Sequence, residues 1–329
     1  MKAISLFSGV GGFDIGFERA GIETVLQAEQ DPWCLEVLAR HWPETERVTD
    51  VRDVRGGVGI DLIYGGFPCQ DVSVAGKRAG LGGERSSLWF EFERILSELR
   101  PRWAVIENVP GLLSSNKGRD FAVILDGLED LGYSVGWAVL DAQNFGVPQR
   151  RRRVFIVAGA TRRSVEQVLS LCESCGGNPE TSAAPRARIA DTPESGIARA
   201  LGGVGGGQDY SSSKGTLVVP DTDRMPFIPQ HAGGVRRLTP LECERLMGWP
   251  DDWTRWTAGG KEIADSHRYR MAGNGVVASV AEWLGHRIVA VDADLGQVSI
   301  PLKTPWYLTD EALAAAIAQE VAWAKETSK

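Results

Sequence analysis

The stretch AISLFSGVGGFDIGFERAG, residues 3–21, predicts a strand, a tight turn and a helix in immediate succession. Its first seven residues form a short β-branched and aromatic run that ends in glycine, which is typical of a strand entering a turn. Phe13, Phe17 and Ala20 then recur at helical spacing, and Gly21 ends the helix. The stretch therefore predicts the first strand–helix unit of an α/β fold.

The same alternation continues through the first half of the chain. Asp31 followed by Pro32 suits the N-cap and first turn of a helix that runs to about His41. Further strands are predicted at residues 23–30, 61–66, 103–109, 134–142 and 152–160, and further helices at 86–100 and 118–132. Strands that alternate with helices of ten or more residues favour an α/β fold with a doubly wound, mainly parallel sheet.

The pattern changes at about Thr161. Residues 161–234 are rich in Gly, Ser, Pro and Ala without a sustained period, which indicates a flexible linker or a small irregular domain. Regularity returns where Thr239, Pro240 and Glu242 supply an N-cap, a first-turn proline and a capping-box acid. Further helices are predicted within residues 273–291 and 309–329. We expect three parts, residues 1–160, 161–234 and 235–329, with the last returning to the first.

Charge and length limit the classes of function. A chain of 329 residues suits one large domain with a smaller second one. The net charge of −7 argues against a generally cationic binder, so contact with nucleic acid requires a local basic patch. Residues 149–163, QRRRRVFIVAGATRR, supply one, with six arginines and no carboxylate.

The cysteines argue for reduced thiols. Five cysteines are an odd number, scattered over a long chain without a secretory signal, and they do not suggest a disulfide framework. Cys172 and Cys175 form one Cys-x-x-Cys, which is at most half of a zinc site, so we expect no metal. Because no apolar run is long enough to cross a bilayer, we expect a soluble, cytoplasmic protein without membrane contact.

The first turn and the two strands that follow it suggest an adenosine-containing cofactor. Glycines after the first strand let backbone amides approach a ligand at the carboxyl edge of the sheet. Glu29, at the end of the second strand, either accepts both ribose hydroxyls or is an ordinary surface residue. Asp50 either accepts from an adenine amino group or caps a loop. A phosphate-binding loop is excluded because Gly76 and Lys77 are followed by Arg78 rather than Ser or Thr.

Cys69, in GGFPCQDVS, is a candidate nucleophile. An isolated Pro-Cys is more often a small buried thiol, but three features favour a reactive one. Glu107 ends an otherwise apolar strand, which is costly without a partner or a role. Arg151 and Arg153 are alternate residues directly before another strand, so their side chains point the same way. The loop at residues 71–87 is long, polar and glycine-containing, as a closing lid would be.

Taken together, these motifs resemble those of the DNA C5-cytosine methyltransferases. FSGVGGFDIGFERAG, GGFPCQDVS, ENVPGLL, QRRRRVFIV, RRLTPLECERLMGWP and GNGVV occur in the order and spacing of that family, over residues 4–289. The irregular residues 161–234 fall where the family carries its target-recognition domain. The resemblance thus implies a catalytic and cofactor-binding domain at 1–160, a target-recognition domain at 161–234 and C-terminal helices at 235–329.

The resemblance also implies a mechanism. Cys69 would add to carbon 6 of a cytosine flipped out of double-stranded DNA, and Glu107 would hold or protonate ring nitrogen 3. Arg153 would lie beside the exocyclic oxygen, and Arg151 would secure that arrangement. Carbon 5 would take the methyl group of S-adenosylmethionine, leaving S-adenosylhomocysteine.

The family pattern assigns the remaining site residues. Gln30 departs from it, because many members have an aromatic residue after the ribose-binding acid; Trp33, one helical turn on, is a possible substitute for stacking. The cofactor would be bound by Phe7, Ser8, Gly9, Gly11, Gly12, Glu29, Asp50 and Asn274. DNA would be bound by Gln70, Ser73, Thr216, Leu217 and Arg236.

The resemblance implies a bacterial or phage-encoded monomer that acts on a short DNA sequence, with a cognate restriction endonuclease as a separate partner. Three alternatives remain open at this point. The same chemistry could act on cytosine in RNA, the chain could be a non-catalytic DNA-binding homologue, or it could be a nucleotide-dependent oxidoreductase. The last leaves FPCQ and QRRRR without a role.

Overall fold

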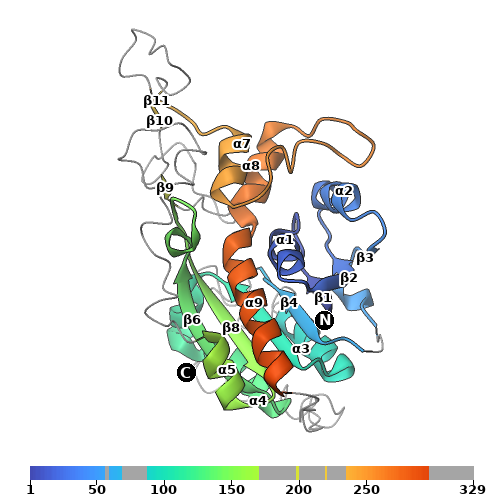
Figure 1. Cartoon of the computed structure of the whole chain (residues 1–329), viewed down its shortest axis with the longest axis vertical. Helices are drawn as coiled ribbons and strands as arrows, with labels where there is room; N and C mark the ends of the chain where they lie inside the picture. The colour runs from blue at the N-terminus through green and yellow to red at the C-terminus, as the bar shows by residue number, and fades with distance from the viewer. Residues whose placement is uncertain (56–58, 69–86, 170–197, 200–218, 221–234, 296–329) are drawn as a thin grey trace, which may run out of the picture.

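A seven-stranded sheet forms the centre of the molecule (Figure 1), in the order β3-β2-β1-β4-β5-β8-β6. The computed structural model describes residues 1–55, 59–68, 87–169, 198–199, 219–220 and 235–295. The strands of the sheet are β1 (Lys2–Leu6), β2 (Glu23–Ala28), β3 (Glu46–Val48), β4 (Leu62–Gly65), β5 (Trp103–Asn108), β6 (Ser134–Asp141) and β8 (Arg152–Gly159). Two short pairs accompany it: β7 (Gln149–Arg150) with β9 (Ala198–Arg199), and β10 (Val219–Pro220) with β11 (Val235–Arg236).

The sheet is mainly parallel, as predicted, and β8 is the exception within it. Strands β1 to β5 pair in parallel, whereas β8 is antiparallel to both β5 and β6. In the register of β5 and β8, Glu107 lies opposite Phe155 and Asn108 opposite Val154. The beginning of β8 therefore lies at the carboxyl end of β5, where the parallel strands also end.

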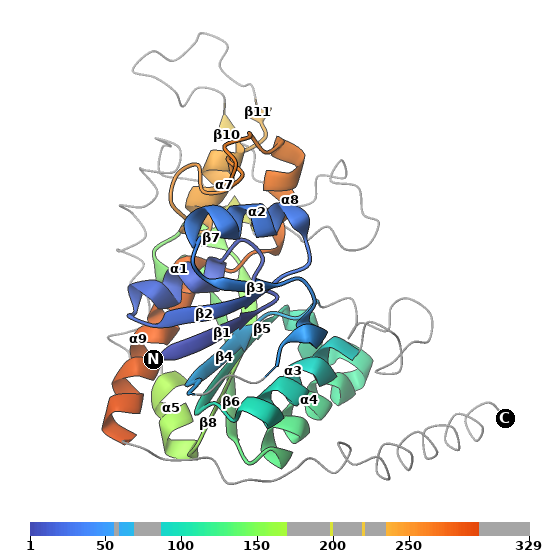
Figure 2. The same cartoon turned by 90° about the vertical axis from the view of Figure 1, so that its right-hand side faces the viewer.

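Helices cover both faces of the sheet (Figure 2). Alternate residues of each strand point to opposite faces. Val105 of β5 thus joins the apolar core beneath one set of helices, and Ile106 joins the core beneath the other. The first set is α1 (Gly12–Arg19), α5 (Arg162–Leu169) and α9 (Ala278–Leu295), and the second is α3 (Ser87–Leu99) and α4 (Arg119–Asp130).

Three more helices lie toward the carboxyl edge of the sheet in Figure 2: α2 (Pro32–His41), α7 (Pro240–Leu246) and α8 (Asp265–Asn274). The predicted caps are confirmed. Asp31 accepts hydrogen bonds from the backbone N–H groups of Trp33 (2.9 Å) and Cys34 (3.2 Å) at the start of α2. Thr239 and Glu242 form the capping box of α7. Short 3-10 helices are η1 (Val51–Asp53), η3 (Pro110–Gly118) and η4 (Ala142–Phe145).

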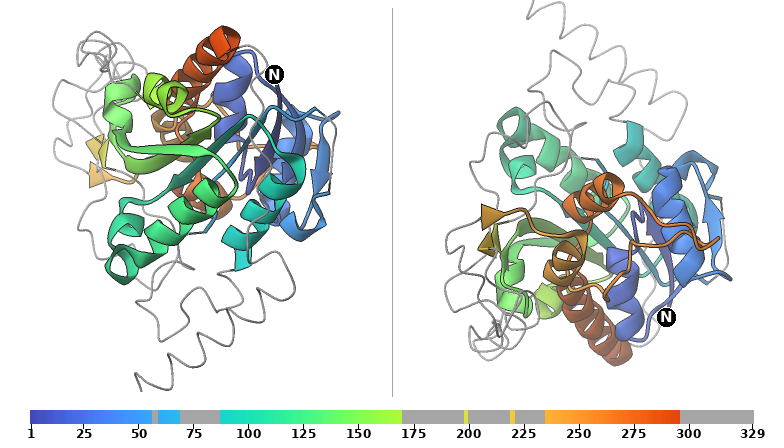
Figure 3. Two further views of the ribbon diagram at one scale, coloured as in Figure 1. Left: turned by 90° about the horizontal axis from the view of Figure 1, so that it is seen from below. Right: turned by 90° about the horizontal axis from the view of Figure 1, so that it is seen from above.

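The C-terminal helix α9 packs against α1, although the two are far apart in the sequence (Figure 3). Glycines allow the close approach, since a Cβ atom on Gly16 would lie 2.4 Å from the carbonyl oxygen of Ala278. A Cβ atom on Gly285 would lie 2.8 Å from the ring of Phe17. The two glycines let the helices pack at a distance that larger residues would prevent.

Two expectations about regular structure are wrong. We expected no helical period after Thr161, but α5 occupies residues 162–169, and Val165 and Val168 are buried against the sheet. Its short length hides the period in the sequence. Helix α8 is also missing from the prediction, because its first six residues, DSHRYR, are mostly polar. The predicted helix at 309–329 lies outside the described residues.

Candidate active site

A cavity of about 660 Å³ opens at the carboxyl edge of the sheet. This volume is within the range of sites for small molecules. The ends of β1, β2, β4 and β5 contribute to its wall, together with the start of β8 and the end of α8. The cavity brings together seven residues predicted from the sequence: Phe7, Gly9, Glu29, Asp50, Glu107, Arg153 and Asn274.

The first turn is held in a conformation that few residues adopt. Phe7 has a φ of 55° and Gly9 a φ of 57°, which for a non-glycine residue such as Phe7 is strained and often marks a functional site. The backbone N–H of Ser8 donates to the carbonyl of Ala28 at 3.0 Å, and its hydroxyl donates to the carbonyl of Ser5 at 3.1 Å. Ser8 therefore connects β1 to β2 rather than facing the cavity.

Gly11 and Gly12, both predicted to bind the cofactor, are packing residues that do not line the cavity. A Cβ atom on Gly11 would lie 2.4 Å from the ring of Trp42, and one on Gly12 would lie 2.4 Å from the carbonyl oxygen of Val276. Their lack of side chains lets the start of α1 approach these neighbours.

Glu29 fastens the first turn to the end of β2. One carboxylate oxygen accepts from the N–H of Gly9 at 2.7 Å, and the other accepts from Gln30 at 2.9 Å and Asp31 at 2.8 Å. Burial raises the pKa of Glu29, and these N–H groups partly oppose the rise. Glu29 lines the cavity, and its Oε2 atom, which accepts one of these three bonds, retains a lone pair for a further donor.

Asp50 has the capping role that was one of its two interpretations from the sequence. It caps η1, accepting from the N–H of Arg52 at 2.9 Å, and pairs with the guanidinium of Arg52 at 2.8 Å. The hydrogen bonds from Arg52 lower the pKa of Asp50. The residue also lines the cavity, so capping and ligand binding are compatible.

Glu107 and Arg153 form an ion pair in the cavity wall, with 3.0 Å between Arg153 Nε and Glu107 Oε1. Burial raises the pKa of Glu107, and Arg153 and then Arg151 oppose the rise. Gly66 lies directly behind this carboxylate, since a Cβ atom there would be 2.8 Å from Oε2. The pair offers a ligand a carboxyl group able to retain a proton beside a fixed cation.

Arg151 lies next to this wall and is 2% exposed. Its Nη2 atom donates to the carbonyl of Gly273 at 2.9 Å and to that of Gly275 at 2.7 Å. These two residues flank Asn274, which lines the cavity. Arg151 thus fixes the end of α8 against the start of β8.

Several predicted residues lie outside the described residues: Cys69, Gln70, Ser73, Thr216 and Leu217. Arg236 belongs to β11, where its backbone pairs with Val219. The chain directly before Cys69 is described. Pro68 lines the cavity, and the carbonyl oxygen of Phe67 accepts from Nδ2 of Asn108 at 3.2 Å.

Asn108 and Arg270 are among the residues that line the cavity but were not predicted as site residues. Asn108 follows Glu107 in the quoted ENV motif, and Arg270 lies one helical turn before Asn274, so helical spacing could have found it. Trp33 does not replace the missing aromatic residue, because its ring stacks on His267 with 4.6 Å between centroids and is not among the residues that line the cavity. Gln30 does line it.

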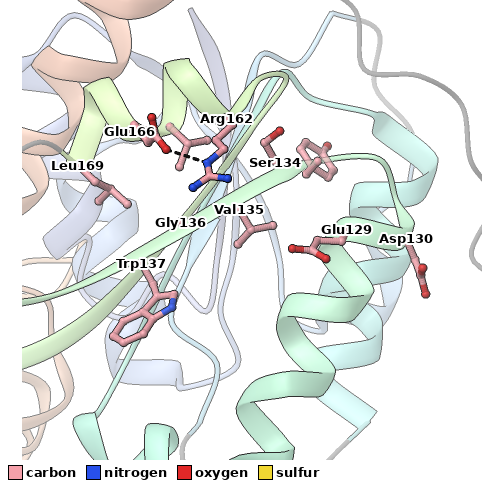
Figure 4. Close-up of a pocket in the computed structure, with 11 residues that line it drawn as sticks. Glu129, Asp130, Ser134, Val135, Gly136, Trp137, Arg162, Glu166 and Leu169 are labelled. Atoms are coloured by element: carbon pink, nitrogen blue, oxygen red, sulfur yellow. Dashed lines mark hydrogen bonds and ion pairs between the residues drawn. The ribbon is translucent and has the colours of Figure 1, made fainter.

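A second hollow, of about 870 Å³, lies between α4, α5 and β6 (Figure 4). The amino-terminal half of β6 contributes to it. Because β8 is antiparallel to both β5 and β6, β6 runs in the same direction as β5. The hollow therefore opens at the edge of the sheet opposite the candidate site. Arg162 pairs there with Glu166 at 2.8 Å. Among the described residues predicted for catalysis or cofactor binding, none lines it.

Within the parts of the chain that the structure describes, no group of His, Cys, Asp and Glu side chains could hold a metal ion. Cys172 and Cys175 lie outside those parts. The helices described there include none that is long and apolar enough to span a membrane.

Comparison with known proteins gives one consistent family. The family model described as C-5 cytosine-specific DNA methylase matches residues 1–196 and 186–290. The Type II methyltransferase M2.BsuMI of Bacillus subtilis (strain 168) is 32% identical over 301 residues, which cover 88% of this chain and 75% of the relative. The Type II methyltransferase M.NlaX of Neisseria lactamica is 32% identical over 312 residues, covering 88% and 96%.

Solved structures agree on the fold. The Entamoeba histolytica methyltransferase EhMeth superposes with a TM-score of 0.63 at 17% identity, covering 90% of this chain and 99% of that one. The S. pombe Dnmt2 methyltransferase gives a TM-score of 0.63 at 17% identity, covering 90% and 100%. The sheet and its covering helices thus have the architecture of these methyltransferases.

Proposed function

The chain belongs to the C-5 cytosine-specific DNA methylase family, and we propose from this premise how its residues divide the transfer of a methyl group to cytosine. Its activity is methylation of carbon 5 of cytosine in DNA. One observation supports the assignment of residues above all: the Glu107–Arg153 pair and the carboxylates of Glu29 and Asp50 line the same cavity. A cytosine site and a cofactor site would therefore adjoin.

S-adenosylmethionine fits the donor set of the cavity. Glu29 would accept the ribose hydroxyls and Asp50 the adenine amino group, because ionised carboxylates act only as acceptors. Phe7, Val51 and Leu88 supply apolar wall for a ring. When bound, S-adenosylmethionine supplies the methyl group that carbon 5 takes up and leaves as S-adenosylhomocysteine.

Glu107 and Arg153 would activate the cytosine. Glu107 would hold or protonate ring nitrogen 3, and the upward shift of its pKa favours the protonated form. The guanidinium of Arg153, held 3.0 Å from that carboxyl group, would donate to the exocyclic oxygen. Both contacts withdraw electrons from the ring, so that carbon 6 becomes electrophilic.

Cys69 would be the nucleophile. Its thiolate adds to carbon 6, the electron pair of the 5,6 double bond is accommodated through nitrogen 3 and its proton, and carbon 5 becomes nucleophilic. After methylation, water takes the proton from carbon 5, the electron pair of that C–H bond restores the 5,6 double bond, and the thiolate leaves carbon 6. The cytosine must leave the duplex for a thiol to reach its face, so base flipping is part of the proposal.

Methyl incorporation into duplex oligonucleotides tests this assignment. We expect Cys69→Ser to bind S-adenosylhomocysteine like the wild type and to lose turnover. Cys243→Ala, which removes a buried thiol of α7, is the matched control and should retain turnover. Undiminished methylation by Cys69→Ser would contradict the nucleophile assignment, and a matched RNA oligonucleotide should remain unmethylated.

We further propose that the protein is a monomer that methylates one short sequence and acts in a restriction–modification pair with a separate endonuclease. The Type II names of its relatives support the restriction–modification part of this proposal. Bisulfite sequencing of host DNA after expression would identify the methylated sequence. Methylation spread without sequence preference would contradict the proposal.

A further inference from the structure

A chain of polar contacts links the two walls of the cavity. The N–H of Gly9 donates to Glu29 at 2.7 Å, and the other oxygen of Glu29 accepts from the N–H of Asp31 at 2.8 Å. Nη2 of Arg270 then donates to Asp31 Oδ2 at 2.6 Å. All four residues line the cavity. These contacts run from the first turn, past the end of β2 and the start of α2, to α8.

Asp31 uses its two oxygens for two separate purposes. Oδ1 caps α2 through the N–H groups of Trp33 and Cys34. Oδ2 accepts from Arg270. Because capping occupies only Oδ1, the contact with Arg270 can be removed by a change that keeps the cap.

One face of α8 is in contact with α2 and the cavity. His267, Arg270 and Asn274 follow at intervals of three and four residues, so they share a face of the helix. His267 stacks on Trp33, Arg270 pairs with Asp31, and Asn274 lines the cavity. The contacts with α2 therefore act together with Arg151 to hold the cavity-facing end of α8 in place.

We infer that Arg270 is a positioning residue whose ion pair with Asp31 holds the wall bearing Asn274 against the wall bearing Glu29 and so sets the affinity for the cofactor. The inference rests on the proposed function, which assigns the cofactor to this cavity. Glu29 and Asn274 are separated by most of the chain, so only tertiary contacts such as this one fix their relative position.

Because the Arg270–Asp31 pair is partly exposed, its contribution to the cofactor affinity should depend on salt concentration. The side chains of Arg270 and Asp31 are 38% and 27% exposed, so salt will screen their attraction. Arg151, which holds the same end of α8, is buried and much less sensitive to salt. The salt-sensitive part of the cofactor affinity should therefore depend on Arg270 and Asp31.

Calorimetry with S-adenosylhomocysteine and the full chain, without DNA, tests this. We expect Arg270→Gln and Asp31→Asn each to weaken binding about fivefold in about 50 mM salt, and the double variant to be no weaker than either single one. In about 500 mM salt the wild type should approach the variants. At saturating cofactor, kcat should be nearly unchanged while KM rises.

The matched control is Arg102→Gln. Arg102 pairs with Asp61 at 2.7 Å, and the side chains are 30% and 26% exposed, but this pair lies before β4 and β5 at the opposite edge of the sheet. Its loss should leave the cofactor affinity unchanged. Equal weakening by Arg102→Gln, additive losses in the double variant, or unchanged affinity in both single variants would overturn the inference.

The inference and the proposed function fail in different ways. A wild-type chain that does not bind S-adenosylhomocysteine would overturn the cofactor assignment itself. A wild-type chain that binds it, with variants that bind equally well, would overturn only the role of Arg270. If Arg270→Gln does not fold, as thermal unfolding would show, Asp31→Asn decides, since it retains the cap of α2.

Discussion

The guanidinium of Arg153 lies against the carboxyl group of Glu107, with 3.0 Å between Nε and Oε1, although the two residues belong to strands that run in opposite directions. The side chains are 15% and 12% exposed. Burial raises the pKa of Glu107 and Arg153 opposes this rise, so the net shift of the pKa of this carboxyl group is upward.

Arg153→Ala should shift the pH dependence of methylation. Without this cation the pKa of Glu107 rises further, so the carboxyl group keeps its proton to a higher pH. The decline in rate that follows ionisation of Glu107 should then begin at higher pH, and the maximal rate should fall about 100-fold because the contact with the cytosine oxygen is lost. Single-turnover methylation measured across pH checks this.

Arg152→Ala is the control for this prediction, because its exposed side chain belongs to the same strand. It should leave the pH profile unchanged. A decline at the same pH in Arg153→Ala and the wild type would show that Glu107 does not control that part of the profile.

Arg151→Met should destabilise the fold by about 3 kcal/mol, because the carbonyls of Gly273 and Gly275 lose their shared donor. Urea unfolding of the full chain measures the loss. Arg150→Met, which changes an exposed neighbour, should cost little. Equal stability of Arg151→Met and the wild type would show that these two hydrogen bonds do not anchor the end of α8.

Asn108→Ala should lower kcat about tenfold and leave the affinity for S-adenosylhomocysteine unchanged. Nδ2 of Asn108 donates to the carbonyl of Phe67, two residues before Cys69, while its Oδ1 accepts from the N–H of Val109 at 2.9 Å. Loss of the donor releases the backbone that leads to the proposed nucleophile, and misplacement of a reacting group is costly. Steady-state kinetics with duplex DNA provides kcat.

Asn108→Asp distinguishes the two hydrogen bonds. The carboxylate still accepts from Val109 but has no proton to donate to the carbonyl of Phe67. We expect kcat to be as low as in Asn108→Ala. Recovery of kcat in Asn108→Asp would assign the effect to Val109 instead.

Local patterns predicted six of the seven strands of the sheet, most helices and the caps correctly, and missed the short edge strand β3. The capping side chains of Asp31 and Thr239 accept hydrogen bonds from backbone N–H groups no more than three residues away, so their function can be inferred without knowing the fold. The mainly parallel sheet likewise follows from alternation of strands and helices. The family motifs then predicted that Glu107 and Arg153 would be close together.

The direction of β8 and the packing of Gly11 and Gly12 could not be predicted from local patterns. The antiparallel course of β8 brings Arg153 to the carboxyl end of β5, and a parallel course would have placed it at the opposite edge. Nothing in the local sequence of β8 distinguishes the two. Similarly, Gly11 and Gly12 resemble residues that approach a ligand, but their neighbours Trp42 and Val276 are distant in sequence.

A buried carboxyl group, that of Glu93, lies outside the candidate site. Glu93 of α3 is fully buried, and neither of its carboxyl oxygens has a hydrogen-bond partner among the residues that the structure describes. A Cβ atom on Gly127 of α4 would lie 2.4 Å from its Oε1, so the group is enclosed between two helices. Burial raises the pKa of Glu93 to about 8, with a smaller contribution from the charge of Asp130.

This pKa makes the stability of the protein depend on pH. In the unfolded chain Glu93 has its ordinary pKa of 4.5, so between that value and about 8 the folded state holds one proton more than the unfolded state. The stabilising effect of that proton is complete below the unfolded pKa. It is lost as pH rises, by about 1.4 kcal/mol per pH unit.

Glu93→Gln should remove this dependence. The neutral amide has nearly the same shape and does not ionise, so the free energy of unfolding should exceed that of the wild type by an amount that grows from about pH 5 to about pH 8. Urea unfolding at several pH values measures the difference. Glu98→Gln, an exposed change on the same helix, should retain the wild-type slope because Glu93 is intact. Parallel pH profiles for Glu93→Gln and the wild type would show that Glu93 does not titrate in this range.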